Sequence, residues 1–292
     1  MATSTVGKVL AETVPAIDAI TIHSKTGVSL EFVFIPPGDY VVGRNIGNTE
    51  LVLRALGQQA GALNEGPERR IKLTRGFYLG RHQIMASQFA EFLNDVDSDT
   101  AERSIKFYDG CNFRKDTDGY HVVDEEARRY PADAVTWDGA VEFTKWFTKK
   151  TGWCVRLPTE DEWEAATRTP QGFLTPTGGP ERKVDPKTGL LPGIRAGSAH
   201  ADVDAFDENI TVNGLFNTLS YVGDWTSSAY RGDRGNRLPD ALFAEDNGGH
   251  VAKRCSNQLT EREPGDEKRV FGMRVLLEAT ESGSPKRKHS DD

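Results

Sequence analysis

RLPTEDEWEAATR, residues 156–168, carries a complete set of signals for the start of a helix. Pro158 keeps the residue before it out of helical space, so the chain enters this segment in an extended conformation. Thr159 and Glu162 are three residues apart and form a capping box, in which each side chain bonds the backbone N–H of the other residue. The acidic first turn suits the positive end of the helix dipole. We therefore expect a helix that begins after Thr159 and stops before Pro170.

A second helix is predicted just before this stretch. Its start lies near Thr136 or Asp138, and Gly152 is the expected C-cap. Apolar side chains recur three and four positions apart, which is the spacing of one buried helix face. These side chains are Ala140, Phe143 and Phe147, with Trp146 beside them. We assign these aromatic residues, and likewise Met85, Phe89 and Trp163, to the core and not to a cofactor site.

Apolar patterns elsewhere predict short strands and one further helix. Residues 21–23 and 28–35 flank a turn at residues 25–27 and indicate a hairpin. Helical spacing at residues 87–94 places Phe89, Phe92 and Leu93 on one side. Residues 95–130 are predicted to be a charged loop, and residues 170–200 an irregular excursion rich in Pro and Gly. Other strands are expected at residues 40–43, 70–73, 76–80 and 270–277.

The composition favours a globular α+β protein over a helical bundle. A chain of 292 residues with 37% hydrophobic content can bury a sizeable core, and 29 Gly and 14 Pro indicate many turns. The formal net charge of −8 argues against general binding to nucleic acid or to an anionic membrane surface. No apolar run approaches the roughly 20 residues of a membrane span. We expect no nucleic-acid partner and no membrane span.

The cysteines and the first residues bear on the cellular compartment. Cys111, Cys154 and Cys255 are the three cysteines, and their spacing gives no disulfide framework. Residues 1–5 lack the basic region followed by an apolar region that a secretion signal requires. The sequence therefore predicts a cytoplasmic protein.

As a whole string, residues 156–168 resemble the signature of the formylglycine-generating, or sulfatase-modifying factor, family. Three further stretches match landmarks of that family: FVFIPPGDYVVG at residues 32–43, VTWDGA at residues 135–140 and FGMRV at residues 271–275. The resemblance implies a C-type-lectin-like α+β fold with short twisted sheets, two main helices and long irregular loops. It covers almost all of residues 18–278, which we expect to form one domain. Residues 1–17 are expected to be a leader, and residues 279–292, with their basic triplet, a disordered tail.

The family resemblance implies an oxidase that holds copper between two cysteines upstream of the last strand. Thiolates suit Cu(I) because both are soft. The interval from Pro264 to Gly272 matches the family, and an ungapped count back from it puts the two copper positions at Asp246 and Val251. Neither residue is a thiol, and Cys255 nearby is a single ligand. Formylglycine-generating oxidase activity is therefore not expected.

Calcium is the one cofactor that the sequence leaves open. Residues 214–226 keep the length of the family's calcium loop, but Ser220 and Tyr221 replace its Gly-Asn pair. Asp224 offers one carboxylate, whereas calcium takes roughly six to eight oxygen ligands. Alternating acids at residues 202–209 are a second candidate, although such runs are more often solvated loops. No metal site is assigned.

The C-terminal loops have the composition of a binding surface. Aromatic side chains and Arg bury area at low entropic cost, so their mixture favours contact with a partner. We predict a non-catalytic module that recognises a protein or a small molecule, as in the display proteins of retroelement systems that share this fold. The candidate ligand-binding residues are Tyr221, Asp224, Trp225, Tyr230, Arg231, His250, Arg254, Cys255 and Asn257.

The alternative is an enzyme of the same family that works without the cysteine pair, as an oxidoreductase or a maturation factor. Cys255, His250, Asp224 and Tyr230 would be its first candidate residues. A structural role in a larger particle is a third interpretation.

Overall fold

The computed structural model describes residues 18–43, 68–168, 201–204, 210–218, 222–229, 250–256, 259–264 and 271–288. The predicted leader, all of residues 170–200 and residues 289–292 lie outside this part of the chain. Within the described residues, no helix combines the length and the apolar character needed to cross a membrane.

A five-stranded sheet brings together the first and last parts of the fold. Its order is β1 (Ala19–His23), β2 (Ser29–Ile35), β5 (Phe77–Gly80), β13 (Leu276–Glu278) and β8 (Val155–Arg156). All neighbouring strands are antiparallel. The predicted N-terminal hairpin is confirmed as β1 and β2, whose alternating apolar residues place one side of the sheet in the core.

A four-stranded sheet carries the region where the binding surface was predicted. Its order is β11 (Leu259–Pro264), β10 (His250–Ser256), β9 (Gly223–Ala229) and β12 (Phe271–Met273). β12 runs parallel to β9, while β10 is antiparallel to both of its neighbours. β3 (Gly38–Val42) and β4 (Arg69–Leu73) form a separate antiparallel pair.

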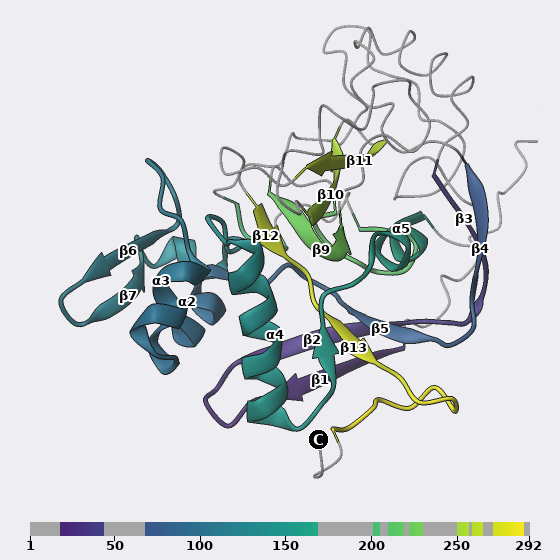
Figure 1. Cartoon of the computed structure of the whole chain (residues 1–292), viewed down its shortest axis with the longest axis horizontal. Helices are drawn as coiled ribbons and strands as arrows, with labels where there is room; N and C mark the ends of the chain where they lie inside the picture. Colours follow the sequence, from purple (N-terminus) through teal and green to yellow (C-terminus); the bar gives the residue numbers. More distant parts are fainter. Residues whose placement is uncertain are drawn as a thin grey trace, which may run out of the picture.

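The expected last strand at residues 270–277 is two strands, which corrects the prediction. β12 ends at Met273 and β13 starts at Leu276, so the chain passes from the four-stranded sheet to the five-stranded sheet between them. Figure 1 shows this crossing as the yellow segment between the two sheets. Arg274 and Val275 make the crossing, and both are buried.

Residues 95–130 are not the loop that the sequence predicted. After α2 (Ala86–Asp95) come α3 (Ser98–Ser104) and a hairpin of β6 (Phe113–Asp116) and β7 (Gly119–Val122). The 3₁₀ helix η2 (Glu126–Arg129) follows. Figure 1 shows the hairpin beside α2 and α3. Each element is short and mostly polar, so none gives a long periodic signal. Together with α4 (Trp137–Thr151) and α5 (Glu160–Arg168), the described part of the chain has four α-helices, of which only α3 was not predicted.

Both helices predicted around the central stretch are confirmed. α4 spans Trp137–Thr151, and its N-cap Thr136 accepts a hydrogen bond from the backbone N–H of Gly139 at 2.9 Å. Gly152 ends the helix with a left-handed φ of 74°, a conformation that glycine adopts without a steric penalty.

α5 spans Glu160–Arg168 and begins with the predicted capping box. The backbone N–H of Thr159 donates to Glu162 Oε2 at 2.8 Å, and the N–H of Glu162 donates to Thr159 Oγ1 at 3.2 Å. Glu162 also receives hydrogen bonds from Arg156. The cap is thereby tied to the strand that precedes it.

Aromatic side chains from α2 and α4 form the centre of the core. Phe89 and Phe92 of α2 meet Phe143 of α4 with ring centroids 6.0 and 5.6 Å apart. Phe147 and Trp163 are fully buried as well. The predicted buried face of each helix is therefore confirmed.

The predicted disordered tail is wrong for residues 279–288, which fold back along residues 152–154, just before β8. The backbone N–H of Lys288 donates to Gly152 O at 2.9 Å, and that of Cys154 donates to Lys286 O at 2.9 Å. The Arg287 guanidinium lies 4.0 Å from the ring centroid of Trp153. The basic triplet is thus bound to the end of α4, where cations also suit the helix dipole.

Candidate functional site

Asp224 on β9 is the centre of a buried polar network. Its side chain is almost fully buried, and each carboxylate oxygen accepts a hydrogen bond. Gln83 Nε2 donates to Oδ1 at 2.9 Å, and Trp163 Nε1 of α5 donates to Oδ2 at 2.9 Å. Arg274 Nε lies 3.3 Å from Oδ2 and completes an ion pair. The network joins the β5–α2 corner, α5 and the strand crossing.

The Arg274 guanidinium is fully buried and is satisfied by the backbone around it. Its Nη1 donates to Gly80 O at 2.7 Å and to Arg81 O at 2.6 Å. Its Nη2 donates to Phe216 O at 2.6 Å. A buried charge requires this degree of pairing, because an unpaired one is very costly. Arg274 therefore acts as a structural tie between segments far apart in the sequence.

Gln83 holds the loop that precedes β9. Its Nε2 also donates to Val222 O at 3.0 Å, and its Oε1 accepts a hydrogen bond from Asn217 Nδ2 at 3.1 Å. Asn217 has a positive φ of 54°, a conformation that asparagine tolerates better than most residues. The sequence did not indicate the place of Gln83 in this network, because its partners are 134 or more residues away along the chain.

Trp225 follows Asp224 on β9 and is also part of the core. Its Nε1 donates to Val135 O at 2.8 Å, and its ring centroid lies 4.6 Å from that of Phe271. Asp224 and Trp225 are 2% and 6% exposed. The structure corrects the prediction that these two residues belong to an exposed binding surface, because their polar atoms are used inside the fold.

The other candidate ligand-binding residues fall in two groups. His250, Arg254 and Cys255 lie on β10, where Arg254 is opposite Glu261 and Cys255 opposite Thr260 in the antiparallel register. Tyr221, Tyr230, Arg231 and Asn257 lie outside the described residues. The structure thus places three of the candidates on one strand, next to β9.

The copper-binding chemistry of the family does not fit this chain. Asp246 lies outside the described residues, and Val251 stands on β10 opposite Pro264. Cys111 is buried, with its Sγ 3.3 Å from Phe113 O. Cys154 lies beside β8 of the five-stranded sheet, whereas Cys255 lies on β10 of the four-stranded sheet. Neither copper position carries a soft sulfur donor.

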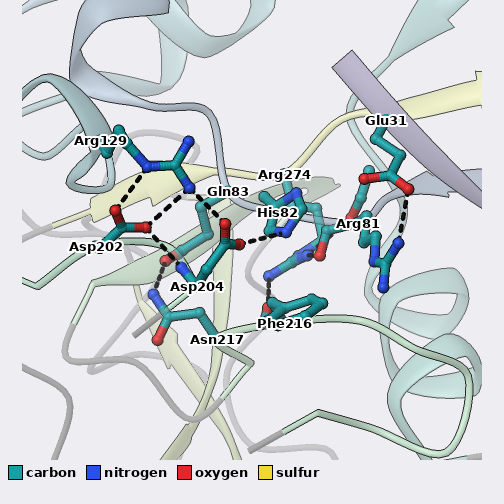
Figure 2. Close-up of polar contacts among 11 residues, drawn as sticks. Glu31, Arg81, His82, Gln83, Arg129, Asp202, Asp204, Phe216, Asn217 and Arg274 are labelled. Carbon is teal, nitrogen blue, oxygen red and sulfur yellow. Dashed lines mark hydrogen bonds and ion pairs between the residues drawn. The ribbon is translucent and has the colours of Figure 1, made fainter. Parts of the chain in front are cut away.

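The acids proposed for calcium are engaged in ion pairs. Figure 2 shows Asp202 and Asp204 on either side of the Arg129 guanidinium, with His82 beyond Asp204. Arg129 Nε lies 2.6 Å from Asp202 Oδ2, and His82 Nε2 lies 2.6 Å from Asp204 Oδ1. Sequence reasoning missed both basic partners, because they are 73 or more residues away along the chain. Residues 205–209 of the candidate lie outside the described part.

A second acidic group lies on the β6–β7 hairpin. Asp116, Asp118 and His121 bring their ligand-type atoms within 4.8 Å of one another. Both acids are exposed, Asp116 pairs with Arg114, and Asp118 lies 3.1 Å from His121 Nε2. These pairings and the exposure of both acids are those of a solvated turn.

We expect His82 to make the protein less stable as the pH falls. Burial lowers the pKa of His82 and Arg274 lowers it further, whereas Asp204 raises it. In the unfolded chain the His82 imidazole has a pKa of about 6.5. It therefore binds a proton more readily there than in the folded protein. The contribution of His82 to the free energy of unfolding is therefore fully present above about pH 6.5 and decreases as the pH falls below that value. The free energy of unfolding, measured by urea titration at several pH values, checks this.

The control variants are compared by the slope of the free energy of unfolding against pH, and not by their absolute stability. His82→Asn should flatten the decrease in the free energy of unfolding below about pH 6.5, and His121→Asn on the hairpin should retain it. An unchanged slope in His82→Asn would assign the pH dependence to another group.

The arrangement of sheets, helices and buried network defines an α+β protein with the formylglycine-generating-enzyme type of C-type-lectin-like fold. The chain belongs to the sulfatase-modifying factor family, because residues 22–279 match the family model described as the sulfatase-modifying factor enzyme 1-like domain. This match confirms the family resemblance stated above and covers most of the chain.

Two solved structures share the fold. PvdO from Pseudomonas aeruginosa has a TM-score of 0.53 and 18% identity, with 88% of this chain and 97% of PvdO covered. Treponema denticola variable protein 1 has a TM-score of 0.55 and 13% identity, with 89% and 98% covered. At these identities the likeness concerns the fold alone.

One curated relative matches a part of the chain. The serine/threonine-protein kinase pkn1 of Chlamydia caviae is 31% identical over 116 residues, which cover 38% of this chain and 17% of the kinase. The match therefore spans less than a fifth of that relative's length.

Proposed function

We propose that this chain is a non-catalytic recognition module of the sulfatase-modifying factor family. It binds a protein or a small-molecule ligand through the loops and strands between Trp225 and Val270. The observation that carries the proposal is the replacement of the family's two copper thiols by Asp246 and Val251. Without two soft donors, the scaffold lacks the group that would activate oxygen in the family's oxidases.

The role of Asp224 supports the same proposal. A catalytic carboxylate has to reach a substrate, whereas both oxygens of Asp224 are used by Gln83, Trp163 and Arg274 inside the fold. The charged and aromatic residues are concentrated further along, in the stretch after β9. A rigid sheet that carries variable loops is a general way to present a binding surface. The Treponema denticola protein of similar fold is named a variable protein, in keeping with such a role.

The alternative is an oxidoreductase or maturation factor that acts without the cysteine pair. The likeness to PvdO extends to the fold only and supplies no catalytic residue for this chain. Cys255 and His250 on β10 remain its candidate residues, with Tyr230 outside the described part. The experiment below separates the two proposals.

We expect the purified full chain to bind no stoichiometric Cu(I) in a competition titration with bicinchoninate. A peptide that carries the sulfatase cysteine motif, incubated with the chain and oxygen, should yield no aldehyde by mass spectrometry. Tight Cu(I) binding or aldehyde formation would overturn the recognition proposal in favour of the enzyme.

The positive test uses a random peptide library displayed on phage and selected on the immobilised chain. Peptides enriched on the wild type should bind Tyr230→Ala and Arg254→Ala at least about tenfold more weakly, a loss of about 1.4 kcal/mol. Lys115→Ala, on the distant β6–β7 hairpin, is the matched control and should bind them normally. Enrichment that is equal on all variants would place the binding surface elsewhere.

A further inference from the structure

Arg129 is inserted between two carboxylates that the sequence marks as candidate calcium ligands. It ends η2, and its Nε and Nη2 lie 2.6 and 3.1 Å from the two oxygens of Asp202. The same Nη2 also donates to Asp204 Oδ2. One guanidinium therefore pairs with both carboxylates, as Figure 2 shows.

The remaining contacts fix this geometry from both sides. Asp204 Oδ1 lies 2.6 Å from His82 Nε2, and the backbone N–H of Asp204 donates to Asp202 Oδ1 at 2.9 Å. The backbone N–H of Val203 donates to Arg129 O at 3.0 Å, and the Val203 side chain is buried. Three of the four carboxylate oxygens thus accept hydrogen bonds from Arg129, and the fourth, Asp204 Oδ1, is buried and lies beside His82 Nε2 without a hydrogen bond.

These contacts are incompatible with a calcium ion at the same carboxylates. Calcium takes roughly six to eight oxygens at about 2.3–2.6 Å, and a guanidinium is a cation with donors only. Partial burial alone would raise the pKa of Asp202, but the hydrogen bonds from Arg129 lower it below the usual range. The carboxylate of Asp202 is therefore ionised and already paired with a cation.

We propose that Arg129 is a built-in cation that replaces calcium at Asp202 and Asp204. It attaches residues 201–204 to η2 without a metal, and these acids become a divalent-cation site only when Arg129 is removed. The Arg129 side chain is half exposed, so the contribution to stability is modest.

The test is thermal unfolding of the full chain in excess EDTA and in millimolar CaCl₂. The wild-type midpoint should be the same in both. Arg129→Gln should unfold about 2–4 °C lower in EDTA, because two adjacent carboxylates lose their cation. CaCl₂ should restore part of this loss by binding the folded state, whereas an equal concentration of NaCl should not.

Two variants make the test specific. Arg128→Gln removes the neighbouring arginine, which pairs with exposed Glu125, and should behave as the wild type in both solutions. Arg129→Gln combined with Asp204→Asn should lose the response to calcium.

Two results would overturn the proposal. In the first, CaCl₂ raises the unfolding midpoint of the wild type as much as that of Arg129→Gln. In the second, CaCl₂ leaves the midpoint of Arg129→Gln unchanged. If Arg129→Gln folds only with calcium, the proposal is supported. If Arg129→Gln folds in neither solution, the calcium bound by the wild type is measured by equilibrium dialysis. Calcium bound at Asp202 would contradict the proposal, and the absence of bound calcium would support it.

One consequence extends to recognition and rests on the function proposed above. Peptide capture by the loops after β9 should be equally strong in EDTA and in CaCl₂. Failure of capture in both solutions would contradict the recognition proposal and leave the thermal result for Arg129 unaffected.

Discussion

Asp224→Ala should lower the free energy of unfolding by about 3–5 kcal/mol, because it leaves the fully buried Arg274 guanidinium without its counter-ion. The substitution also removes the acceptors for Gln83 and Trp163, whose donors cannot reach water from inside the fold. Urea unfolding followed by tryptophan fluorescence measures the loss.

The control is Asp109→Ala, which removes the same carboxylate from an exposed position and should change stability by no more than about 0.5 kcal/mol. Asp224→Asn should fall between the two, since an amide keeps an acceptor oxygen but loses the charge. If Asp224→Ala were as stable as the wild type and only ligand binding were weaker, the residue would belong to the binding surface after all.

Features that depend on neighbours in the sequence could be predicted from it. The capping box of Thr159 and Glu162 involves residues three apart, and the buried face of α4 follows from the spacing of Phe143 and Phe147. Both are confirmed because no distant partner is needed to form them. The same holds for the hairpin of β1 and β2.

Features that depend on distant partners could not be predicted in the same way. Asp224 meets Gln83 from 141 residues away, and Arg274 meets Gly80 from 194 residues away. Nothing in the local pattern of Asp224 distinguishes a buried ion-pair partner from a surface acid. The family resemblance supplied the fold but not the partners of these residues.

The C-terminal segment shows how composition misleads when a docking site is far away. Residues 279–288 are polar and basic, which is typical of disorder. Their order comes from backbone hydrogen bonds with Gly152 and Cys154, just before β8, and from the ring of Trp153, which contacts the Arg287 guanidinium. A signal for this docking would have required knowing that β8 is an edge strand of the five-stranded sheet.

Gly139→Ala should destabilise the protein by on the order of 3 kcal/mol, although alanine is normally the better helix former by about 1 kcal/mol. Gly139 lies in the first turn of α4, and a Cβ there would come 2.1 Å from Ser104 O and 2.6 Å from Ser104 Cα. These are backbone atoms, and Ser104 O also accepts a hydrogen bond from the backbone N–H of Thr136. Neither helix can therefore move away without breaking the cap of α4, so the overlap outweighs the gain in helix propensity.

The matched control for this substitution is Lys145→Ala, which adds alanine to an exposed position of α4 and should change stability by about 0.5 kcal/mol or less. Urea unfolding of both variants separates the overlap from the intrinsic preference of the helix. A Gly139→Ala variant at least as stable as the wild type would mean that α3 and α4 do not approach this closely. Because α4 carries the aromatic core and Trp137 Nε1 donates to Thr226 O on β9, a shift of its first turn should also reach the sheet that bears the proposed binding surface.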